Sequence, residues 1–292
     1  MVSLENHPHF SWTPSGQSSF SGPLLDLYRR LDNHFLAWAA SYRATEHLFP
    51  IFIQAAELNK LEYFKNFPHL VTFPVTLDAG EENMSRFTEG TPMDVEGRVH
   101  LTALAPVQDV LTPAACYHCY IRYQGTRLDA PLFLTTRCAC FRRETHYLPL
   151  RRQWHFSMRE IICVGGAEEV KAFLESGREK VAAFFESIRL PIKWEDATDP
   201  FFRPTRNPKA LLQRLDPVKK EMIYGDGLDG LAGLAIGSTN FHRNYFGEAF
   251  RIERNGEDAF SGCIAFGLER WIYAILDHYG EDPGNWPTLE GA

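Results

Sequence analysis

Two stretches of alternating side chains constrain the fold more than any other feature of the chain. Residues 131–144 and 154–164 alternate with the period of two that is typical of β-strands, and only the loop 145–153 separates them. Because so short a connection joins antiparallel strands, the two stretches predict a hairpin. Asn255-Gly256, between two extended runs within 248–267, predicts another. Together they predict the α+β class, an antiparallel β-sheet flanked by helices, rather than βαβ units.

Helical spacing of apolar residues marks the segments that flank this sheet. The clearest helix is predicted over 167–190, and another follows Ser21-Gly22-Pro23. Further helices are predicted over 53–66 and 207–222, an extended segment over 67–75 and a loop over 196–206. Since no repeat or low-complexity linker divides the chain, we predict an N-terminal arm, 1–20, and a single domain, 21–292.

The overall composition narrows the classes of function. Hydrophobic residues make up 45% and charged residues 23% of the 292 residues, as in ordinary soluble globular proteins. The first 20 residues lack the apolar core of a secretory signal and no stretch is long enough to span a membrane, so we expect no membrane partner and a cytoplasmic location. A net charge of −7 argues against a broad nucleic-acid surface but permits a local basic site for one small anion.

Six cysteines are spaced too irregularly for a disulfide scaffold in a chain of this length. Reduced thiols or metal ligands are therefore the better interpretations. Cys116 and Cys119 form a C-x2-C pair, but no second pair follows, so a zinc knuckle is not predicted. Cys138, Cys140 and Cys163 are expected to be small buried apolar residues, which is the usual environment of free cysteine.

A basic cluster interrupts this acidic chain, because residues 140–160 contain five arginines. Alternation places Arg142 and Glu144 on one face of the first strand, with Cys138 and Cys140. The residues that share a face of the return strand are Phe156, Met158, Glu160 and Ile162. If the two faces coincide, a guanidinium, two carboxylates and an aromatic ring surround one position on the sheet.

These side chains have the chemistry that a nucleoside triphosphate requires. Arg142 can pair bidentately with a phosphate, Glu144 can accept a hydrogen bond from an amino group, and Phe156 can stack on a base. Arg151 and Arg152 on the loop can close over the phosphates. The alternative is that these residues pair with one another on a hydrated sheet face, where an ion pair contributes about 0–1 kcal/mol.

The stretch 261–270 favours the nucleotide site over that alternative. Cys263 lies among small side chains on one strand face, which leaves room for a ligand. Arg270 falls in the first turn of the following helix, where a cation is unfavourable for the helix dipole and indicates a functional placement. No GxxxxGK[ST] motif occurs, and the glycine-rich segment 225–233 lacks its lysine and is predicted to be a flexible loop, so any ATP would bind without a P-loop.

Several short motifs resemble those of a known family. F-R-R-E at 141–144 with Phe156, and G-L-E-R at 267–270, resemble motifs 2 and 3 of the class II aminoacyl-tRNA synthetase fold. The ordered set LTPAACY, FSMREII, DPFFRP, NFHRNYFG and SGCIAFGLER resembles the amino acid:[carrier protein] ligases, which are relatives of atypical zinc-dependent seryl-tRNA synthetases and lack a tRNA-binding domain. The resemblance covers roughly residues 45–290 and implies a class II synthetase-like catalytic domain.

The resemblance implies a zinc site. In that family two cysteines and a glutamate hold the metal, and the matching residues here are Cys116, Glu160 and Cys263. Three protein ligands leave a tetrahedral position open for the amino group of an amino acid. Strand phase leaves Cys119 open as an alternative to Cys116.

The resemblance also implies roles around the nucleotide. Arg142 would stabilise the α-phosphate and Arg270 would hold the γ-phosphate, while Glu144 and Phe156 would place adenine and Mg²⁺ would bridge the phosphates. Glu221 is a candidate Mg²⁺ ligand, although a solvated helix end explains it equally well. The stretch 234–241 lacks the carboxylate with which ordinary seryl synthetases hold magnesium.

Two residues of NFHRNYFG, Asn240 and His242, are expected to line the substrate pocket. The alternative for Asn240 is that it caps a turn. The family branch favours small amino acids such as glycine and alanine, but the sequence does not specify which one is activated.

The expected reaction has two steps and a macromolecular acceptor. ATP activates a small amino acid as its adenylate, and the aminoacyl group then passes to the phosphopantetheine thiol of a carrier protein. The segment 204–220, with five basic residues and one acidic residue, could dock an acidic carrier protein as a helix. A homodimer is implied by resemblance, because residues 48–74 look like a degenerate first motif. The alternatives are an enzyme that charges tRNA, which the acidic chain disfavours, and a silent paralogue that acts as a binding module.

Overall fold

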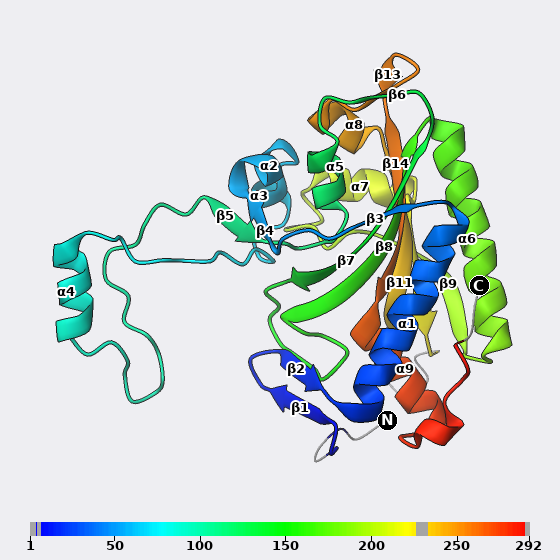
Figure 1. Cartoon of the computed structure of the whole chain (residues 1–292). Helices are drawn as coiled ribbons and strands as arrows, with labels where there is room; N and C mark the ends of the chain where they lie inside the picture. Colours follow the sequence, from blue (N-terminus) through cyan, green and yellow to red (C-terminus); the bar gives the residue numbers. More distant parts are fainter. Residues whose placement is uncertain (1–3, 5–6, 226–232, 290–292) are drawn as a thin grey trace.

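A seven-stranded sheet forms the centre of the computed structural model, which describes residue 4 and residues 7–225 and 233–289 (Figure 1). Every neighbouring pair in this sheet is antiparallel except the edge pair β3–β7, so the predicted antiparallel α+β architecture is confirmed. In spatial order the strands are β3 (Thr45–His47), β7 (Leu132–Phe141), β8 (His155–Gly165), β14 (Phe260–Gly267), β11 (Leu234–Arg243), β10 (Lys219–Tyr224) and β9 (Ile192–Ala197).

The predicted hairpin is the pair β7–β8, and its register places Cys138 opposite Met158 and Cys140 opposite Phe156. The two predicted faces therefore coincide. The first strand is shorter than predicted, because it ends at Phe141 rather than at 144. Arg142 still donates its backbone N–H to the carbonyl of Trp154 (2.9 Å). The backbone N–H of Arg143 donates to the carbonyl of Leu70 (3.0 Å), which is not part of the sheet, so the chain leaves the sheet at this residue.

Three helices cover one face of the sheet (Figure 1). They are α1 (Gly22–Ser41), α6 (Ala167–Ser187) and α9 (Leu268–Tyr279), and the first two confirm the helices predicted after residues 21–23 and over 167–190. Aromatic rings fill the layer between helices and sheet: Phe35 stacks on Phe266 at 3.9 Å between ring centroids, and Trp271 is fully buried beside them. This core holds the sheet on the side away from the functional cavity.

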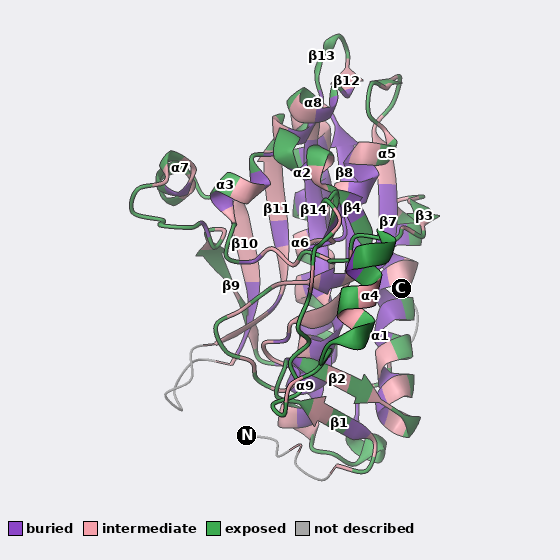
Figure 2. Cartoon of the chain, turned by 90° about the vertical axis from the view of Figure 1, so that its left-hand side faces the viewer, coloured by how far each residue is buried: buried purple, intermediate pink, exposed green. Residues whose placement is uncertain are grey.

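Short helices gather over the other face, and the buried central strands lie beneath them (Figure 2). They are α2 (Ala55–Lys60), α3 (Tyr63–Asn66), α5 (Tyr117–Arg122) and α8 (Tyr245–Phe250). The single helix predicted over 53–66 is wrong, since Glu62 adopts a left-handed conformation (φ 49°) between α2 and α3. Residues 67–75, predicted to be extended, form an irregular segment without a strand.

The helix predicted over 207–222 is also wrong in its second half. Helix α7 (Pro208–Leu215) ends before Asp216-Pro217, because a proline disfavours a helical conformation in the residue before it. Residues 219–222 then enter β10 and pair with both β9 and β11. Pairing across the sheet therefore overrides the local helical pattern.

The remaining elements lie at the periphery. The predicted N-terminal arm contains the hairpin β1 (Phe10–Thr13) and β2 (Gln17–Phe20), and helix α4 (Glu81–Glu89) lies far from the sheet (Figure 1). The Asn255-Gly256 turn joins β12 (Glu253–Arg254) to β13 (Glu257–Asp258), with φ of 56° and 83°, but α8 replaces the first part of the extended run predicted before it. The other elements are β4 (Phe52–Gln54), β5 (Asp109–Leu111), β6 (Arg127–Leu128) and the 3₁₀ turn Pro283–Asn285.

Most of the predicted flexible loop, residues 226–232, lies outside the described residues. Among the helices of the described residues, none has both the length and the apolar character needed to cross a membrane.

Candidate functional site

A cavity of about 520 Å³ opens over the face of the sheet that α1 and α6 leave free. Strands β8, β14, β11 and β10 form its floor, and segments before α5, around α7 and at the start of α9 form its walls. All predicted site residues line it: Cys116, Arg142, Glu144, Phe156, Glu160, Glu221, Asn240, His242, Cys263 and Arg270. Residues far apart in the sequence therefore share one cavity.

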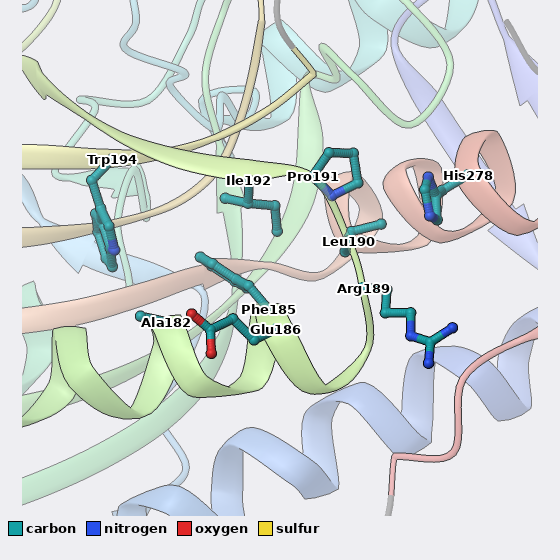
Figure 3. A pocket seen from close by; sticks show the side chains of 9 residues that line it. All are labelled: Ala182, Phe185, Glu186, Arg189, Leu190, Pro191, Ile192, Trp194 and His278. Atoms are coloured by element: carbon teal, nitrogen blue, oxygen red, sulfur yellow. The ribbon is translucent and has the colours of Figure 1, made fainter.

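A second cavity, of about 410 Å³, lies between α6, β9 and the end of α9 (Figure 3). Phe185, Arg189, Trp194 and His278 are among its lining residues. None of the predicted site residues lines it, so the larger cavity is the candidate site.

Three potential metal ligands converge at one end of the larger cavity. The ligand atoms of Cys116, Glu160 and Cys263 all lie within 4.8 Å of one another, and all three residues are buried. Sheet register explains two of them, because Ala265 lies opposite Glu160 and Cys263 is two residues away on the same face of β14. Cys116 comes from the residue before α5. Cys119, which the sequence left open, is buried but is not part of this cluster among the described residues.

The electrostatics of the cluster fit a cation. The hydrogen bond to Cys263, burial and the charge of Glu160 raise the pKa of the Cys116 thiol well above its ordinary value. The bond from Cys116 lowers the pKa of Cys263, but burial and Glu160 outweigh it and the net shift is upward. Burial and the charge of Glu160 thus disfavour ionisation of both thiols, and a divalent cation would reverse the effect.

The hydrogen bonding of Glu160 agrees with a ligand role. Its Oε1 accepts the backbone N–H groups of Ala115 (3.0 Å) and Cys116 (3.3 Å). Its Oε2 is buried and has no hydrogen-bond partner among the residues that the structure describes. A buried carboxylate oxygen without a partner is costly, so this oxygen is available for a metal ion.

Asn240 and His242 lie on β11 next to this cluster. Asn240 donates to Cys263 Sγ (3.3 Å) and to Ser238 Oγ (3.1 Å), so it belongs to a strand and does not cap a turn. His242 Nδ1 lies 3.2 Å from both Tyr120 Oη and Ser261 Oγ. Burial lowers the pKa of His242 to about 4, which keeps its imidazole neutral near pH 7.

Guanidinium groups gather at the other end of the cavity. Arg270 Nε donates to the Arg151 carbonyl (2.8 Å) and its Nη1 donates to the Ala235 carbonyl (2.7 Å), which fixes its orientation. Burial, followed by repulsion from Arg142, lowers the pKa of Arg270 to about 10. Arg142 donates to the Pro113 carbonyl (2.9 Å) and lies over the Phe156 ring, 5.3 Å from its centroid. A polyanion between these arginines would relieve their repulsion.

The other predicted nucleotide residues lie in the same region but differ in their pairing. Glu144 accepts a hydrogen bond from Arg152 (2.9 Å). The alternative interpretation, that arginines and glutamates of this cluster pair with one another, therefore holds for these two residues. Glu221 lies on β10, within 3.0 Å of Lys219 Nζ, and the solvated helix end considered for it is wrong. Arg151 places its guanidinium over the ring of Tyr273, 5.1 Å from the centroid.

Sequence reasoning missed several residues that line the cavity. Asp199 and Lys219 form an ion pair (3.4 Å), and Lys209 pairs with Glu62 (2.8 Å), which connects α7 to the residue before α3. Glu269 is another omission, although it lies in the recognised G-L-E-R motif. Asp199 also lies in a recognised motif, DPFFRP, whereas no local pattern singled out Lys209.

Comparison with known proteins identifies the family and the fold of the chain. No family model matches the chain. The chain is 32% identical over 272 residues to amino acid–[acyl-carrier-protein] ligase 1 of Bradyrhizobium diazoefficiens, covering 90% of this chain and 81% of the relative. It is 31% identical to ligase 2 of the same organism, covering 82% and 71%. It is also 24% identical to a type-2 serine–tRNA ligase of Methanococcus aeolicus, covering 94% of this chain but 55% of that relative.

Solved structures establish the fold. A complex of M. kandleri seryl-tRNA synthetase with A. aeolicus tRNASec matches 96% of this chain and 57% of its own, with a TM-score of 0.79 at 22% identity. Prolyl-tRNA synthetase of Cryptosporidium parvum matches with a TM-score of 0.68 at 13% identity, over 95% of this chain and 51% of its own. This chain spans about half the length of either. It has the catalytic-domain fold of class II aminoacyl-tRNA synthetases and belongs to the amino acid–[acyl-carrier-protein] ligase family.

Proposed function

We propose that this enzyme activates a small amino acid with ATP and transfers it to the phosphopantetheine thiol of a carrier protein. In the first step a carboxylate oxygen of the amino acid attacks the α-phosphorus, and pyrophosphate leaves. In the second step the carrier thiolate attacks the carbonyl carbon of the adenylate, and AMP leaves with the electron pair of the broken bond. The names of the two Bradyrhizobium relatives support this reaction.

One observation carries the proposal: a single cavity contains both the Cys/Glu/Cys cluster and the half-buried Arg142 and Arg270. The first site suits the amino group of an amino acid through a metal, and the second suits a triphosphate. We assign Arg142 to the α-phosphate, where charge develops during attack, and Arg270 to the γ-phosphate. Catalysis is then mainly positioning and charge neutralisation.

The remaining residues are assigned to the nucleotide end or to the metal end of the cavity. Phe156 stacks on adenine and Glu144 accepts a hydrogen bond from its amino group, for which Arg152 must release part of its contact. Mg²⁺ accompanies the phosphates, and the position of Glu221 on the cavity floor supports it as a ligand. Zn²⁺ held by Cys116, Glu160 and Cys263 would supply a Lewis acid that binds the amino group.

Helix α7 is the proposed docking site for the carrier protein. Three of the five basic residues of segment 204–220, namely Lys209, Lys219 and Lys220, form ion pairs within the chain, which leaves less positive charge for an acidic partner. Exposed leucines support docking instead: Leu211 is 45% and Leu215 84% exposed on the same helix that lines the cavity. A carrier bound there would bring its pantetheine arm to the cavity mouth.

A homodimer is proposed from a projecting segment, residues 73–107, called the projecting arm here (Figure 1). More than half of the large apolar side chains exposed among the described residues lie on it. It is ordered by its own contacts, including the bond from Asp78 N–H to the Ala103 carbonyl (2.9 Å). Leu48, which follows the edge strand β3, and Phe52 on β4 are also exposed. A second copy of the chain would cover both surfaces.

An enzyme that charges tRNA and a silent paralogue are the two competing functions. Pyrophosphate exchange distinguishes the silent paralogue from the carrier-protein ligase, and the acceptor that is aminoacylated distinguishes the enzyme that charges tRNA. We propose residues 21–292 as one catalytic domain that follows the arm 1–20. We place the enzyme in the cytoplasm, where ATP is available and the thiols stay reduced.

We predict that the purified enzyme binds one Zn²⁺ per chain. Cys263→Ser should lower the zinc content severalfold, because two remaining protein ligands hold zinc weakly. Metal analysis after dialysis measures the content. The matched control is Cys163→Ser, a buried cysteine outside the cluster, which should retain zinc. Equal zinc in both variants would contradict the assigned ligand set.

We predict amino-acid-dependent exchange of pyrophosphate into ATP, restricted to one or two small amino acids and lost when zinc is removed. Arg142→Ala should lower this exchange by at least about a hundredfold, because a charge-stabilising donor is lost from the transition state. Arg143→Ala should retain activity, since Arg143 does not line the cavity. Exchange at the wild-type rate in Arg142→Ala would rule out the phosphate role, and no exchange by the zinc-loaded wild type would favour the silent paralogue.

We predict that the double substitution Leu211→Glu with Leu215→Glu blocks transfer but not activation. Aminoacylation of a carrier protein should fall by about tenfold or more, as for buried contacts of an interface, while pyrophosphate exchange stays unchanged. Gel mobility of the carrier protein measures transfer. Unchanged transfer would exclude α7 as the docking site, and aminoacylation of tRNA instead would favour the alternative acceptor.

We predict that the enzyme sediments as a dimer and that Val95→Asp with Leu101→Asp shifts it to the monomer, because each charge would be buried without a partner at the interface. Analytical ultracentrifugation measures the mass. The α7 double variant is the matched control and should remain dimeric. A monomeric wild type, or a variant that stays dimeric, would contradict the role of the projecting arm.

A further inference from the structure

A buried carboxylate connects the two parts of the nucleotide site. Glu269 is 4% exposed, lies in the first turn of α9 and lines the cavity. Both of its carboxylate oxygens accept the backbone N–H of Ser157 on β8, each at 2.9 Å. This three-centre hydrogen bond joins the start of a helix to the first part of a strand that is 112 residues away in the chain.

The residues next to Ser157 and Glu269 in the chain both belong to the proposed nucleotide site. Phe156, the proposed adenine platform, directly precedes Ser157. Arg142 lies over the ring of Phe156. Arg270, the proposed γ-phosphate ligand, directly follows Glu269. The bond therefore sets the distance between two side chains that must contact opposite ends of the same nucleotide.

We infer that Glu269 is a positioning residue that keeps the adenine platform aligned with the triphosphate-binding Arg270. The inference rests on the proposed function and deepens it, because it explains how residues on β8 and α9 act on one ATP. Misalignment by a fraction of an ångström weakens a ligand that spans both subsites more than a ligand that fills one of them.

An ordinary capping role does not account for the environment of Glu269. Glu169 is the matched case: it also lies in the first turn of a helix and accepts a backbone N–H, from Gly166 (2.7 Å). Glu169 pairs with Arg254, which lowers its pKa, whereas among the described residues Glu269 has no ion-pair partner and burial raises its pKa to about 7. The chain thus keeps a costly buried carboxylate where a neutral acceptor would cap the helix equally well.

Protonation of Glu269 should therefore weaken the binding of ATP. Other groups also act on it: Ser157 on β8, Tyr28 on α1, Cys140 on β7 and Arg270 on its own helix. The pKa of Tyr28 and that of Cys140 are both raised, so neither group titrates near neutral pH. Above pH 7 the carboxylate holds the Ser157 N–H with both oxygens, and below pH 7 the neutral acid holds it less strongly.

The test is the pH dependence of pyrophosphate exchange in wild type and Glu269→Gln. In wild type the KM for ATP should rise as the pH falls from 8 to 6. At pH 8 Glu269→Gln should raise this KM about tenfold, as expected for loss of a hydrogen bond to a charged group, and should abolish its change around pH 7. The inhibition constant of AMP, which does not reach Arg270, should rise less than the KM for ATP. Glu169→Gln should lower thermal stability but keep the wild-type KM and pH profile.

The outcomes separate this inference from the proposed function. An equal rise for AMP and ATP, or a wild-type pH profile in Glu269→Gln, would overturn the positioning role while leaving the ligase function intact. A wild type that shows no amino-acid-dependent exchange at any pH would overturn both. If Glu269→Gln folds poorly, Glu269→Asp provides the second measurement: its shorter carboxylate should raise the KM for ATP but keep the pH dependence, and a loss of that dependence would overturn the inference.

Discussion

The antiparallel register of β8, β14 and β11 is the constraint on which the site depends. In a sheet, successive side chains point to opposite faces, so a slip of one residue would move a whole set to the other side. The observed register directs Glu160, Cys263 and Asn240 toward the cavity, while Ile161 and Ile264 enter the aromatic core under α1 and α6. The same pairing that stabilises the sheet thus brings Glu160 and Cys263 together in the candidate metal site.

The two ends of the cavity suit ligands of opposite charge. At one end, burial and the charge of Glu160 disfavour ionisation of the Cys116 and Cys263 thiols, and at the other end the guanidinium groups of Arg142 and Arg270 repel each other. Such arrangements cost stability, and the densely packed core on the opposite face offsets the cost. A dication and a polyanion would relieve both, so the site is preorganised for substrates that carry complementary charge.

The parts of the chain that project from this core have a different character. Helix α7 and the projecting arm carry apolar side chains that the fold leaves exposed, whereas the residues of the candidate site line the cavity. Glu269 is buried, and it joins β8 and α9, which both contribute residues to the proposed nucleotide site. In the proposed function, the sheet positions the reacting groups and the peripheral segments are the surfaces assigned to macromolecular partners.

Local patterns in the sequence determined the strand faces of the hairpin, the helices after residues 21–23 and over 167–190, and the start of a helix at Leu268. These features depend on alternation, helical periodicity and capping, which neighbours in the chain specify. Only the tertiary structure decided that Cys116 and Cys263 approach Glu160 from 44 and 103 residues away in the sequence, that Glu269 bonds to Ser157, and that residues 219–222 form a strand. The physical reason is that strand pairing and burial are non-local: they override weak helical propensity, and they bring together side chains whose spacing in the sequence carries no signal.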